Sequence, residues 1–436
     1  MKRVLIITYY WPPSGGSGVQ RWLKFSKYLP KYGWQPVIYT PENPHFNLKD
    51  ESLLADVVSE AEIIKYPIWE PYRYYERIFQ YGDENSGNIG ILPKKDKKSL
   101  SRTFVNWVRG TFFIPDPRVF WVKPSVKFLS KYLQDHPVDV IITTGPPHSM
   151  HLIGLKLKEK FNISWLADFR DPWSQLDILQ EFDLSKSSKS KHEQLERSVL
   201  QNATKVLMVN EGGKRELEKV AQRPVEVITN GFDQDDFRSL EKPQQEKFMV
   251  SHFGLLNDFR NPEILWEVLE QLCQENPQFD SKLDLRLGGA IAGDIKKQIL
   301  DYPHLSGKVT FYKYLEHDQV IRTYCDSYVL LLPLNKTSLG KIFMTGKIFE
   351  YLAVGKPILA FGLEESDAGQ LIKQTCAGEI VSFDDKDKLK EIINSWFRDF
   401  PNNPINPLKQ EIRKFTRDNL TKELVDLLEE MLEAKS

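Results

Sequence analysis

The sequence predicts an α/β protein with two doubly wound domains, each built on a parallel sheet. Short apolar runs alternate with helical stretches along most of the chain, which is typical of repeated strand–helix units. Within each run the apolar residues are continuous rather than alternating, and this pattern indicates strands that are buried on both faces of a sheet. The chain has 436 residues, more than the ~250–300 residues at which a single hydrophobic core stops growing.

Apolar runs in both halves of the chain predict the strands. In the first half these runs are Val4–Thr8, Pro36–Tyr39, Val138–Thr143, Ile163–Ala167, Val206–Val209 and Val225–Ile228. In the second half they are Phe248–Phe253, Leu283–Leu287, Val309–Phe311, Tyr328–Leu332, Ile358–Phe361 and Glu379–Val381. The polar segment Asp233–Glu246 interrupts this rhythm and is expected to be a linker. We therefore place an N-terminal domain at residues 1–235 and a C-terminal domain at residues 246–404.

The chain ends in an amphipathic pattern, with apolar residues at helical spacing from Leu408 to Met431. Such spacing predicts a helix with one apolar face. No strand follows the pattern, so we expect residues 405–436 to form a helix that packs on a surface built by the preceding chain.

The segment at about residues 68–123 departs from the strand–helix rhythm and is rich in aromatic and basic residues. Between Leu92 and Arg118 it carries seven Lys or Arg residues against two Asp residues. Aromatic side chains among cations suit an anionic membrane surface or a lipid diphosphate. The alternative is an inserted subdomain with its own aromatic core and a solvated basic face.

Composition and charge argue against several classes of protein. A formal net charge of −1 disfavours nucleic acid as the main partner, because binding to a phosphate backbone needs a basic surplus. The three cysteines lie far apart without metal-ligand spacing, so we expect reduced thiols. We recognise neither a signal peptide nor an apolar run of membrane-span length. The expectation is a cytoplasmic protein, with peripheral contact at the inner face of the membrane left open.

A glycine-rich turn follows the first predicted strand, with Gly15, Gly16, Ser17 and Gly18 before a helix. Such a turn lets a ligand approach backbone amides at a helix start, so we predict an acceptor-binding or phosphate-binding loop. A dinucleotide-binding turn would need a third glycine where this chain has Arg21, which disfavours a nicotinamide-dependent dehydrogenase. A simple chain reversal that uses the glycine dihedral angles is the alternative.

Charged and imidazole side chains follow two of the buried strands in the first half. They are His148 after one strand, and Asp168, Arg170 and Asp171 after the next. The carboxyl ends of parallel strands meet at the edge where α/β proteins bind ligands. We therefore predict that these four residues form the reacting centre and handle protons and a sugar hydroxyl. The alternative is structural, with a loop turn at Asp171 and an ion pair between Asp168 and Arg170.

The segment from Thr345 to Pro357 predicts a phosphate-binding helix. It opens with Thr345 and Gly346 and places Lys347 and Glu350 one turn apart. The first amides of a helix are unpaired and carry the positive end of its dipole, which suits a phosphate. Lys347 would add a point charge, and Glu350 would accept hydrogen bonds from two ribose hydroxyls. The alternative is an ordinary amphipathic helix with a solvated Lys–Glu pair.

A second loop is expected to complete this anion site. The strand Phe248–Phe253 is followed by Gly254 and then by a loop that contains Arg260. A planar guanidinium binds phosphate through two N–H groups, so we predict that Gly254 and Arg260 join Lys347 in binding a diphosphate. Histidines other than His148 and His252 are expected to be surface or packing residues.

Taken in order along the chain, these motifs resemble the family 4 glycosyltransferases of the GT-B fold, which use nucleotide-sugar donors. The resemblance covers nearly the full length. The segments that carry it are Gly15-Gly16, Asn230-Gly231-Phe232-Asp233, the loop from Gly254 to Arg260, and Phe349-Glu350-Tyr351-Leu352-Ala353 with Gly355-Lys356-Pro357. The segment Asp168-Phe169-Arg170-Asp171-Pro172-Trp173 looks like a subgroup of bacterial enzymes that build surface polysaccharides.

The resemblance implies two Rossmann-like domains that face each other across a cleft. The N-terminal domain would bind the acceptor, the C-terminal domain would bind the donor, and the last helix would cross back to the N-terminal domain. Transfer would retain the anomeric configuration and need no metal ion or other cofactor. Helix dipoles together with Lys347 and Arg260 would stabilise the leaving diphosphate.

Two positions depart from the family pattern. Glu350 matches the second of two glutamates, the ribose ligand, but the first would fall at position 342, where this chain has Ile342. The arginine that usually follows the glycine at position 254 is replaced by Leu255. A histidine of many relatives falls near Arg170, so His148 or Asp168 would take its place.

The sequence therefore predicts a hexosyltransferase-type enzyme of surface polysaccharide biosynthesis, which moves a sugar from a nucleotide-diphosphate sugar to a glycan or lipid-linked acceptor. One alternative is a nucleotide-sugar epimerase, which uses a similar two-domain architecture. The other is a non-catalytic nucleotide-binding or glycan-binding scaffold derived from a GT-B enzyme, and the residues Leu255 and Ile342 motivate it.

Overall fold

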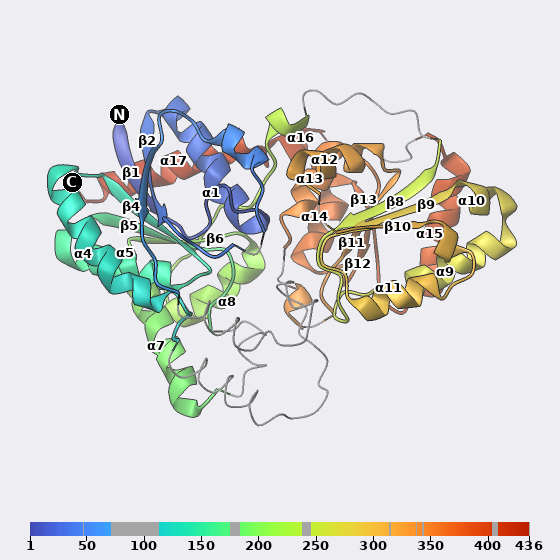
Figure 1. Cartoon of the computed structure of the whole chain (residues 1–436), viewed down its shortest axis with the longest axis horizontal. Coiled ribbons are helices and arrows are strands. Elements are labelled where there is room, and N and C mark those ends of the chain that lie inside the picture. Colours follow the sequence, from blue (N-terminus) through green and yellow to red (C-terminus); the bar gives the residue numbers. More distant parts are fainter. Residues whose placement is uncertain are drawn as a thin grey trace. The chain divides into compact units, whose positions relative to one another are not determined.

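The computed structural model describes residues 1–46, 48–70, 113–174, 184–237, 246–313, 315–336, 338–341, 344–402 and 409–435. These residues form two compact α/β units (Figure 1). The first unit combines the chain up to Thr229 with the segment Arg417–Ser436, and the second unit contains Asn230–Thr416. Most of the aromatic and basic segment at about residues 68–123, and part of the predicted linker, lie outside the described residues.

The first unit is built on a seven-stranded parallel sheet with the order β3-β2-β1-β4-β5-β6-β7. Its strands are β1 Lys2–Ile7, β2 Trp34–Pro41, β3 Glu62–Tyr66, β4 Val140–Gly145, β5 Ser164–Phe169, β6 Lys205–Met208 and β7 Glu226–Val227. Its helices are α1 Ser17–Tyr28, α4 Val119–Asp135, α5 Ser149–Phe161, α7 Lys186–Asn202, α8 Glu211–Ala221 and α17 Arg417–Glu433, with short 3₁₀ turns at Leu29–Tyr32 and Ser52–Asp56.

Hydrophobic cores cover both faces of this sheet, as the continuous apolar runs predicted. Val4 and Ile6 of β1 pack in a core with α1 and α17, whereas Leu5 and Ile7 pack in another core with α4, α5 and α7. Successive side chains of a strand point to opposite faces, so a strand between two helical layers needs apolar residues at every position. Both β4 and β5 are buried throughout.

The sequence missed one strand of the first unit, β3. It pairs in parallel with β2, with Ile63 opposite Ile38, and it lies at the edge of the sheet. Its residues are mostly half-buried, and Lys65 is exposed. Since only Ile63 and Ile64 are consecutive aliphatic residues, an edge strand of this kind lacks the apolar run that identified the other strands.

The second unit is built on a six-stranded parallel sheet with the order β10-β9-β8-β11-β12-β13. Its strands are β8 Phe248–Phe253, β9 Leu283–Gly288, β10 Val309–Tyr312, β11 Val329–Pro333, β12 Ile358–Phe361 and β13 Gly378–Val381. Its helices are α9 Glu263–Glu275, α10 Pro277–Lys282, α11 Gly293–Leu300, α12 His317–Asp326, α13 Lys347–Val354, α14 Asp367–Thr375, α15 Lys386–Asp399 and α16 Lys409–Arg413, with 3₁₀ turns at Gln234–Phe237, Leu305–Gly307 and Ser338–Lys341.

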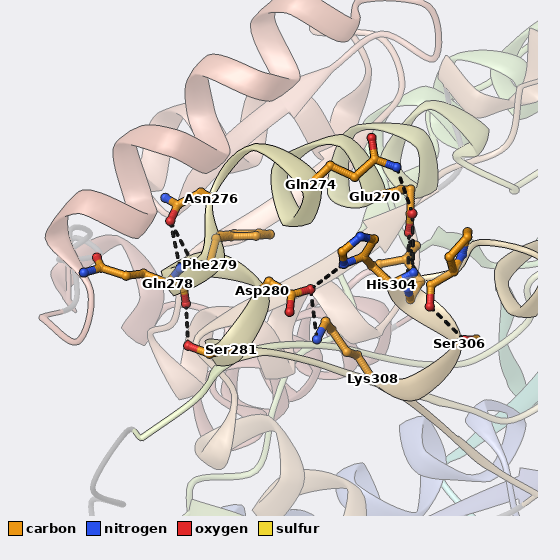
Figure 2. Close-up of polar contacts among 12 residues, drawn as sticks. Glu270, Gln274, Asn276, Gln278, Phe279, Asp280, Ser281, His304, Ser306 and Lys308 are labelled. Atoms are coloured by element: carbon orange, nitrogen blue, oxygen red, sulfur yellow. Dashed lines mark hydrogen bonds and ion pairs between the residues drawn. The ribbon is translucent and has the colours of Figure 1, made fainter.

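Two carboxylates, the buried Glu270 and the half-buried Asp280, join the helices of the second unit to its loops (Figure 2). Glu270 on α9 accepts hydrogen bonds from the backbone N–H groups of His304 and Leu305, at 3.0 and 3.2 Å. Asp280 on α10 accepts from His304 Nδ1 at 2.8 Å and pairs with Lys308 Nζ at 3.1 Å. Burial alone would raise the pKa of Asp280, but His304 and Lys308 lower it overall. These contacts are structural ties between elements.

The C-terminal segment differs from the single helix that the sequence predicted. It forms α16 and α17, which are separated by a turn in which Thr416 forms a β-bridge with Phe232. The backbone of this turn is therefore used for pairing instead of continuing a helix. Helix α17 then packs with α1 in the first unit, where Leu420, Leu424 and Leu428 share a core with Trp22 (Figure 1). Among the described helices, none is long and apolar enough to cross a membrane.

Candidate functional site

A close-packed glycine marks the carboxyl end of strand β8 in the second unit. The amide of Gly254 donates to the carbonyl of Gly288 at 2.9 Å. A Cβ atom at position 254 would lie 2.6 Å from Nζ of Lys347 and 3.1 Å from Nε2 of His252. The structure therefore brings Gly254 and Lys347 together, although they are far apart in the sequence, and glycine is required if the lysine is to lie so close to the backbone.

Lys347 and Glu350 lie at the start of α13, as the sequence predicted. The turn before this helix includes Thr345, whose carbonyl accepts from the amide of Ile348 at 3.3 Å, and Gly346, whose carbonyl accepts from Phe349 at 3.2 Å. The opposite face of α13 is buried in the core of the second unit. Lys347 and Glu350 are half-buried rather than fully solvated.

The electrostatics of this site favour an anion. Burial lowers the pKa of Lys347, Glu350 offsets part of that effect, and the nearby guanidinium of Arg260 lowers the pKa further. Lys347 forms no ion pair with any residue that the structure describes. Arg260 donates from Nε to the neutral side chain of Asn335 at 2.5 Å, and burial lowers its pKa also. Two partly desolvated cations that act on each other are stabilised when a negative charge binds between them.

His252 is the residue of this site to which sequence reasoning assigned no role. Its side chain is 3% exposed, and Nδ1 lies 3.0 Å from the carbonyl oxygen of Leu331 on the neighbouring strand β11. Burial, together with Lys347 and Arg260, lowers the pKa of His252 to about 3, so the ring is neutral. Because a carbonyl can only accept, Nδ1 carries the proton and Nε2 has a lone pair. Nε2 is buried without a hydrogen-bond partner.

In the first unit, the glycine turn packs against the loop after β5. Gly16 has a φ of +87° and precedes α1, and the amide of Gly15 donates to Leu48 at 3.0 Å. The carbonyl of Gly18 accepts from Nη1 of Arg170 at 2.6 Å. A Cβ atom at Gly18 would lie 3.3 Å from this same nitrogen, so the glycine leaves room for the arginine. Ser17 begins the helix directly after Gly16.

Asp168 is the centre of a buried ion-pair network. Its carboxylate is 0% exposed and accepts from Nη2 of Arg21 at 3.0 Å, from Nε1 of Trp22 at 2.7 Å and from Oγ1 of Thr144 at 2.9 Å. Arg21 also donates to the carbonyl oxygen of Ile228 at 2.9 Å. The structural alternative paired Asp168 with Arg170. The structure shows that Asp168 instead pairs with Arg21. This network ties α1, β4, β5 and the end of β7 together.

The other charged residues of the predicted reacting centre lie in the loop after β5. Arg170 donates to the carbonyl oxygens of Gly18 and Pro146, and so joins three loops at the carboxyl edge of the sheet. Asp171 is half-buried. Burial raises the pKa of its carboxyl group, and the charge of Arg170 offsets part of this rise. Arg170 therefore has a positioning function in this edge, and Asp171 is its neighbouring carboxylate.

His148 lies in a buried cluster of aromatic and imidazole rings at this edge. It is 5% exposed and stacks on Trp173, with ring centroids 4.8 Å apart and planes at 5°. Burial, with His151, Arg170 and His192, lowers the pKa of His148 well below its ordinary value, and neither of its ring nitrogens has a hydrogen-bond partner. A neutral imidazole offers one donor and one acceptor, which matches a hydroxyl group.

The sequence did not anticipate how the neighbours of His148 are held. Nε1 of Trp173 donates to Nδ1 of His192 at 3.1 Å, and the backbone N–H of Trp173 donates to Glu196 at 3.2 Å. His151 contacts Thr143 at 2.8 Å. His151 lies only one helical turn after His148, but His192 and Glu196 come from α7, so spacing alone gives no signal for their contacts with Trp173.

A further network surrounds the half-buried Arg118, one of the seven Lys or Arg residues counted between Leu92 and Arg118. Its guanidinium pairs with Glu70 at 3.3 Å and lies over the ring of Tyr9, 4.5 Å from the centroid. Tyr9 donates to Glu70 at 2.7 Å. The charge of Arg118 is therefore paired within the unit, and the other six cations of that count lie outside the described residues.

Comparisons with known proteins identify the fold. No protein-family model matches the sequence, and no curated protein matches it. Solved structures match over essentially the whole chain. A sucrose-phosphate synthase from Thermosynechococcus elongatus has 14% identity and a TM-score of 0.63, with 100% of both chains covered. The trehalose-6-phosphate synthase OtsA has 11% identity and a TM-score of 0.63, with 98% of this chain and 99% of that chain covered.

A third similar structure is WaaG, a glycosyltransferase involved in lipopolysaccharide biosynthesis, with 12% identity, a TM-score of 0.54 and 99% of both chains covered. At these identities the likeness establishes the fold. This chain has the α/β GT-B fold of glycosyltransferases, and the predicted fold class is confirmed. In the described part of the chain, no group of three or more His, Cys, Asp or Glu residues is arranged to hold a metal ion.

Proposed function

We propose that this protein is a glycosyltransferase that moves a sugar from a nucleoside-diphosphate sugar to a glycan or lipid-linked acceptor in surface polysaccharide biosynthesis. The observation that carries this proposal is the convergence of Lys347 and Arg260 beside Gly254, where two partly desolvated cations act on one another. A fold shared with sucrose-phosphate and trehalose-6-phosphate synthases supports it.

In this proposal the second unit binds the donor. The diphosphate is bound by Lys347, Arg260, the turn Thr345–Gly346 and the backbone at Gly254. Glu350 accepts hydrogen bonds from the ribose hydroxyls. The two cations stabilise the negative charge that develops on the departing diphosphate, which is electrostatic catalysis by groups already in place. We extend the proposal to retention of the anomeric configuration and to transfer without a metal ion.

The first unit would bind the acceptor through the loop Gly15–Gly18 and the edge formed by β4 and β5. His148 is the group best suited to an acceptor hydroxyl, because its neutral ring offers a donor and an acceptor without internal partners. Arg170 and Asp171 complete this edge. Asp168, which is fully paired with Arg21, would act by holding the loop that carries them.

We also propose a cytoplasmic location with peripheral contact at the inner face of the membrane. Two exposed aromatic side chains of the inserted segment support it, Trp69 at 60% and Phe120 at 42% exposure. Their ring centroids lie 5.3 Å apart, and amphipathic aromatic rings are favoured at a lipid interface. Binding to anionic vesicles that disappears in the double variant Trp69→Ser, Phe120→Ser would support this contact, and unchanged binding would exclude these residues from it.

The test of the function is calorimetric binding of UDP, GDP, ADP, TDP and CMP without added metal, with wild type beside Glu350→Ala. One diphosphate should bind clearly better than the others. Its affinity should fall ~10–100-fold in the variant, because a hydrogen bond to a charged group contributes ~1.5–3 kcal/mol. If none of them binds, the donor site is refuted and the scaffold alternative, motivated by Leu255 and Ile342, would be favoured.

Products separate the proposal from the epimerase alternative. A transferase releases the nucleoside diphosphate when an acceptor is present, whereas an epimerase keeps it attached to the sugar. Free diphosphate that accumulates only with acceptor would support transfer, and an altered sugar that is still attached to the nucleotide would contradict it.

A further inference from the structure

The imidazole of His252 has one buried nitrogen, Nε2, that forms no hydrogen bond with a described residue, although the backbone of Leu255 also acts on the ring. Nδ1 is committed to the carbonyl oxygen of Leu331 at 3.0 Å, which fixes the neutral tautomer with a lone pair on Nε2. This lone pair is buried and without a partner, although a buried acceptor of this kind ordinarily has one. We therefore expect a hydrogen-bond donor close to the Nε2 lone pair.

The ammonium group of Lys347 is a donor close to this nitrogen. Nε2 of His252 and Nζ of Lys347 lie 3.1 and 2.6 Å from the same point, the position that a Cβ atom of Gly254 would occupy. Cε of the lysine lies 2.9 Å from that point, so rotation about the last side-chain bond moves Nζ within this small space. Such rotamer changes are fast and cost little for a lysine.

We propose that His252 is a positioning residue of the anion site: its Nε2 accepts a hydrogen bond from the Lys347 ammonium and directs the remaining two N–H bonds toward a bound diphosphate. This inference rests on the proposed function for the identity of the anion. Both phosphates of a nucleoside-diphosphate sugar are fully deprotonated at neutral pH and have no proton to donate, so an acceptor at this place serves the lysine rather than the donor substrate itself. An ammonium has three donors, one for His252 and two for the ligand.

The charged groups that act on this pair come from two elements. Arg260, from the loop after β8, disfavours the charged form of Lys347, and Glu350, from the same helix as Lys347, favours it. Burial of Lys347 acts in the same direction as Arg260. A neutral acceptor that stabilises the ammonium without cancelling its charge offsets this penalty and leaves the whole positive charge for the ligand.

The test uses three substitutions that separate the two ring nitrogens. His252→Asn keeps a donor for Leu331 but has no atom at the place of Nε2, His252→Gln brings an amide oxygen near that place, and His252→Phe removes both nitrogens. His304→Asn is the matched control, because His304 lies in the same unit and contacts Asp280 rather than the anion site. The probes are inorganic pyrophosphate and the nucleoside diphosphate that binds best, titrated between pH 6 and pH 10.

Binding should weaken as pH rises through the pKa of Lys347, because the neutral amine no longer attracts the anion. Loss of the acceptor destabilises the ammonium, so this alkaline limb should move to lower pH by about one unit or more in His252→Asn and His252→Phe. His252→Gln should restore most of the shift, and His304→Asn should leave the limb in place. A purely structural role for His252 would lower affinity at every pH without moving the limb.

A second measurement does not depend on any ligand. The pH dependence with which an amine-selective reagent labels Lys347, read by mass spectrometry, reports the pKa of that lysine directly. This pKa should fall in His252→Asn and recover in His252→Gln. If it is the same in all variants, the inference is refuted even when diphosphates bind. If wild type binds no diphosphate but the labelling shift is present, the proposed function fails and the positioning contact stands.

Discussion

Substitution of Gly254 by alanine should disable the anion site while leaving the fold intact. The new Cβ would lie 2.6 Å from Nζ and 2.9 Å from Cε of Lys347, and real Cβ atoms essentially never come within 3.0 Å of another atom. The atoms in the way belong to the far end of a flexible side chain and to the His252 ring, not to the backbone. The lysine can therefore move aside at little cost to stability, and its ammonium leaves the site.

The size of the effect follows from the interaction that is lost. A hydrogen bond to a charged group contributes ~1.5–3 kcal/mol, which corresponds to a ~10–100-fold loss of affinity for pyrophosphate or a nucleoside diphosphate. Calorimetry on wild type and Gly254→Ala measures this loss, and denaturant unfolding measures stability. The unfolding midpoint of Gly254→Ala should differ from that of wild type by no more than the midpoint of the control Gly293→Ala does. A Cβ atom at position 293 meets nothing within 4 Å.

Gly289→Ala provides the opposite control. Gly289 has a φ of +90°, and a Cβ there would lie 2.7 Å from the backbone oxygen of Gly254. Neither the positive φ nor the contact with the backbone oxygen can be relieved by a side-chain rotation. The free energy of unfolding of this variant should therefore fall by ~1–3 kcal/mol. If Gly254→Ala binds pyrophosphate as wild type does, Lys347 is not part of the anion site. If Gly254→Ala loses as much stability as Gly289→Ala, the space beside Gly254 is needed for packing and not for the anion site.

The remaining predictions concern the structural networks. Asp168→Asn should lower the free energy of unfolding by ~3–5 kcal/mol, because it leaves the buried guanidinium of Arg21 without its counter-charge; a loss below 1 kcal/mol in denaturant unfolding would show that the pair is not the tie inferred here. Glu270→Ala should destabilise the second unit by ~1.5–3 kcal/mol, since it leaves two backbone N–H groups without their acceptor, and hydrogen exchange at His304 and Leu305 should rise most; unchanged exchange there would contradict the role of Glu270.

The strands and the proximity of Gly254, Arg260 and Lys347 followed from the sequence for the same physical reason. A strand between two helical layers must be apolar at every position, and its position in a parallel sheet places the residues after its carboxyl end at one edge. Gly254 and Arg260 follow β8, Lys347 follows the neighbouring β11, and the structure places these three close together. Their proximity could therefore be predicted without knowledge of any side-chain contact.

Features that depend on a partner from a remote element could not be predicted in this way. The counter-ion of Asp168 is Arg21, which precedes it by 147 residues, whereas sequence proximity suggested Arg170. The neutral state of His252 depends on burial and on the charges of Lys347 and Arg260, and its tautomer depends on a carbonyl of the neighbouring strand β11. Strand β3 was missed because an edge strand needs less apolar sequence than a central one. In each case the decisive quantity is a tertiary contact that local sequence does not encode.

The two units treat charge differently, and this difference supports the ligands proposed for them. At the edge of the first unit the buried charges are balanced internally, Asp168 by Arg21 and Glu70 by Arg118. His148 is a neutral ring there, and neither of its nitrogens forms a hydrogen bond with a described residue. At the edge of the second unit Lys347 forms no ion pair with a described residue and is opposed by a second cation. A neutral hydroxyl compound complements the first edge and a polyanion complements the second, as the acceptor and donor of a glycosyltransferase would.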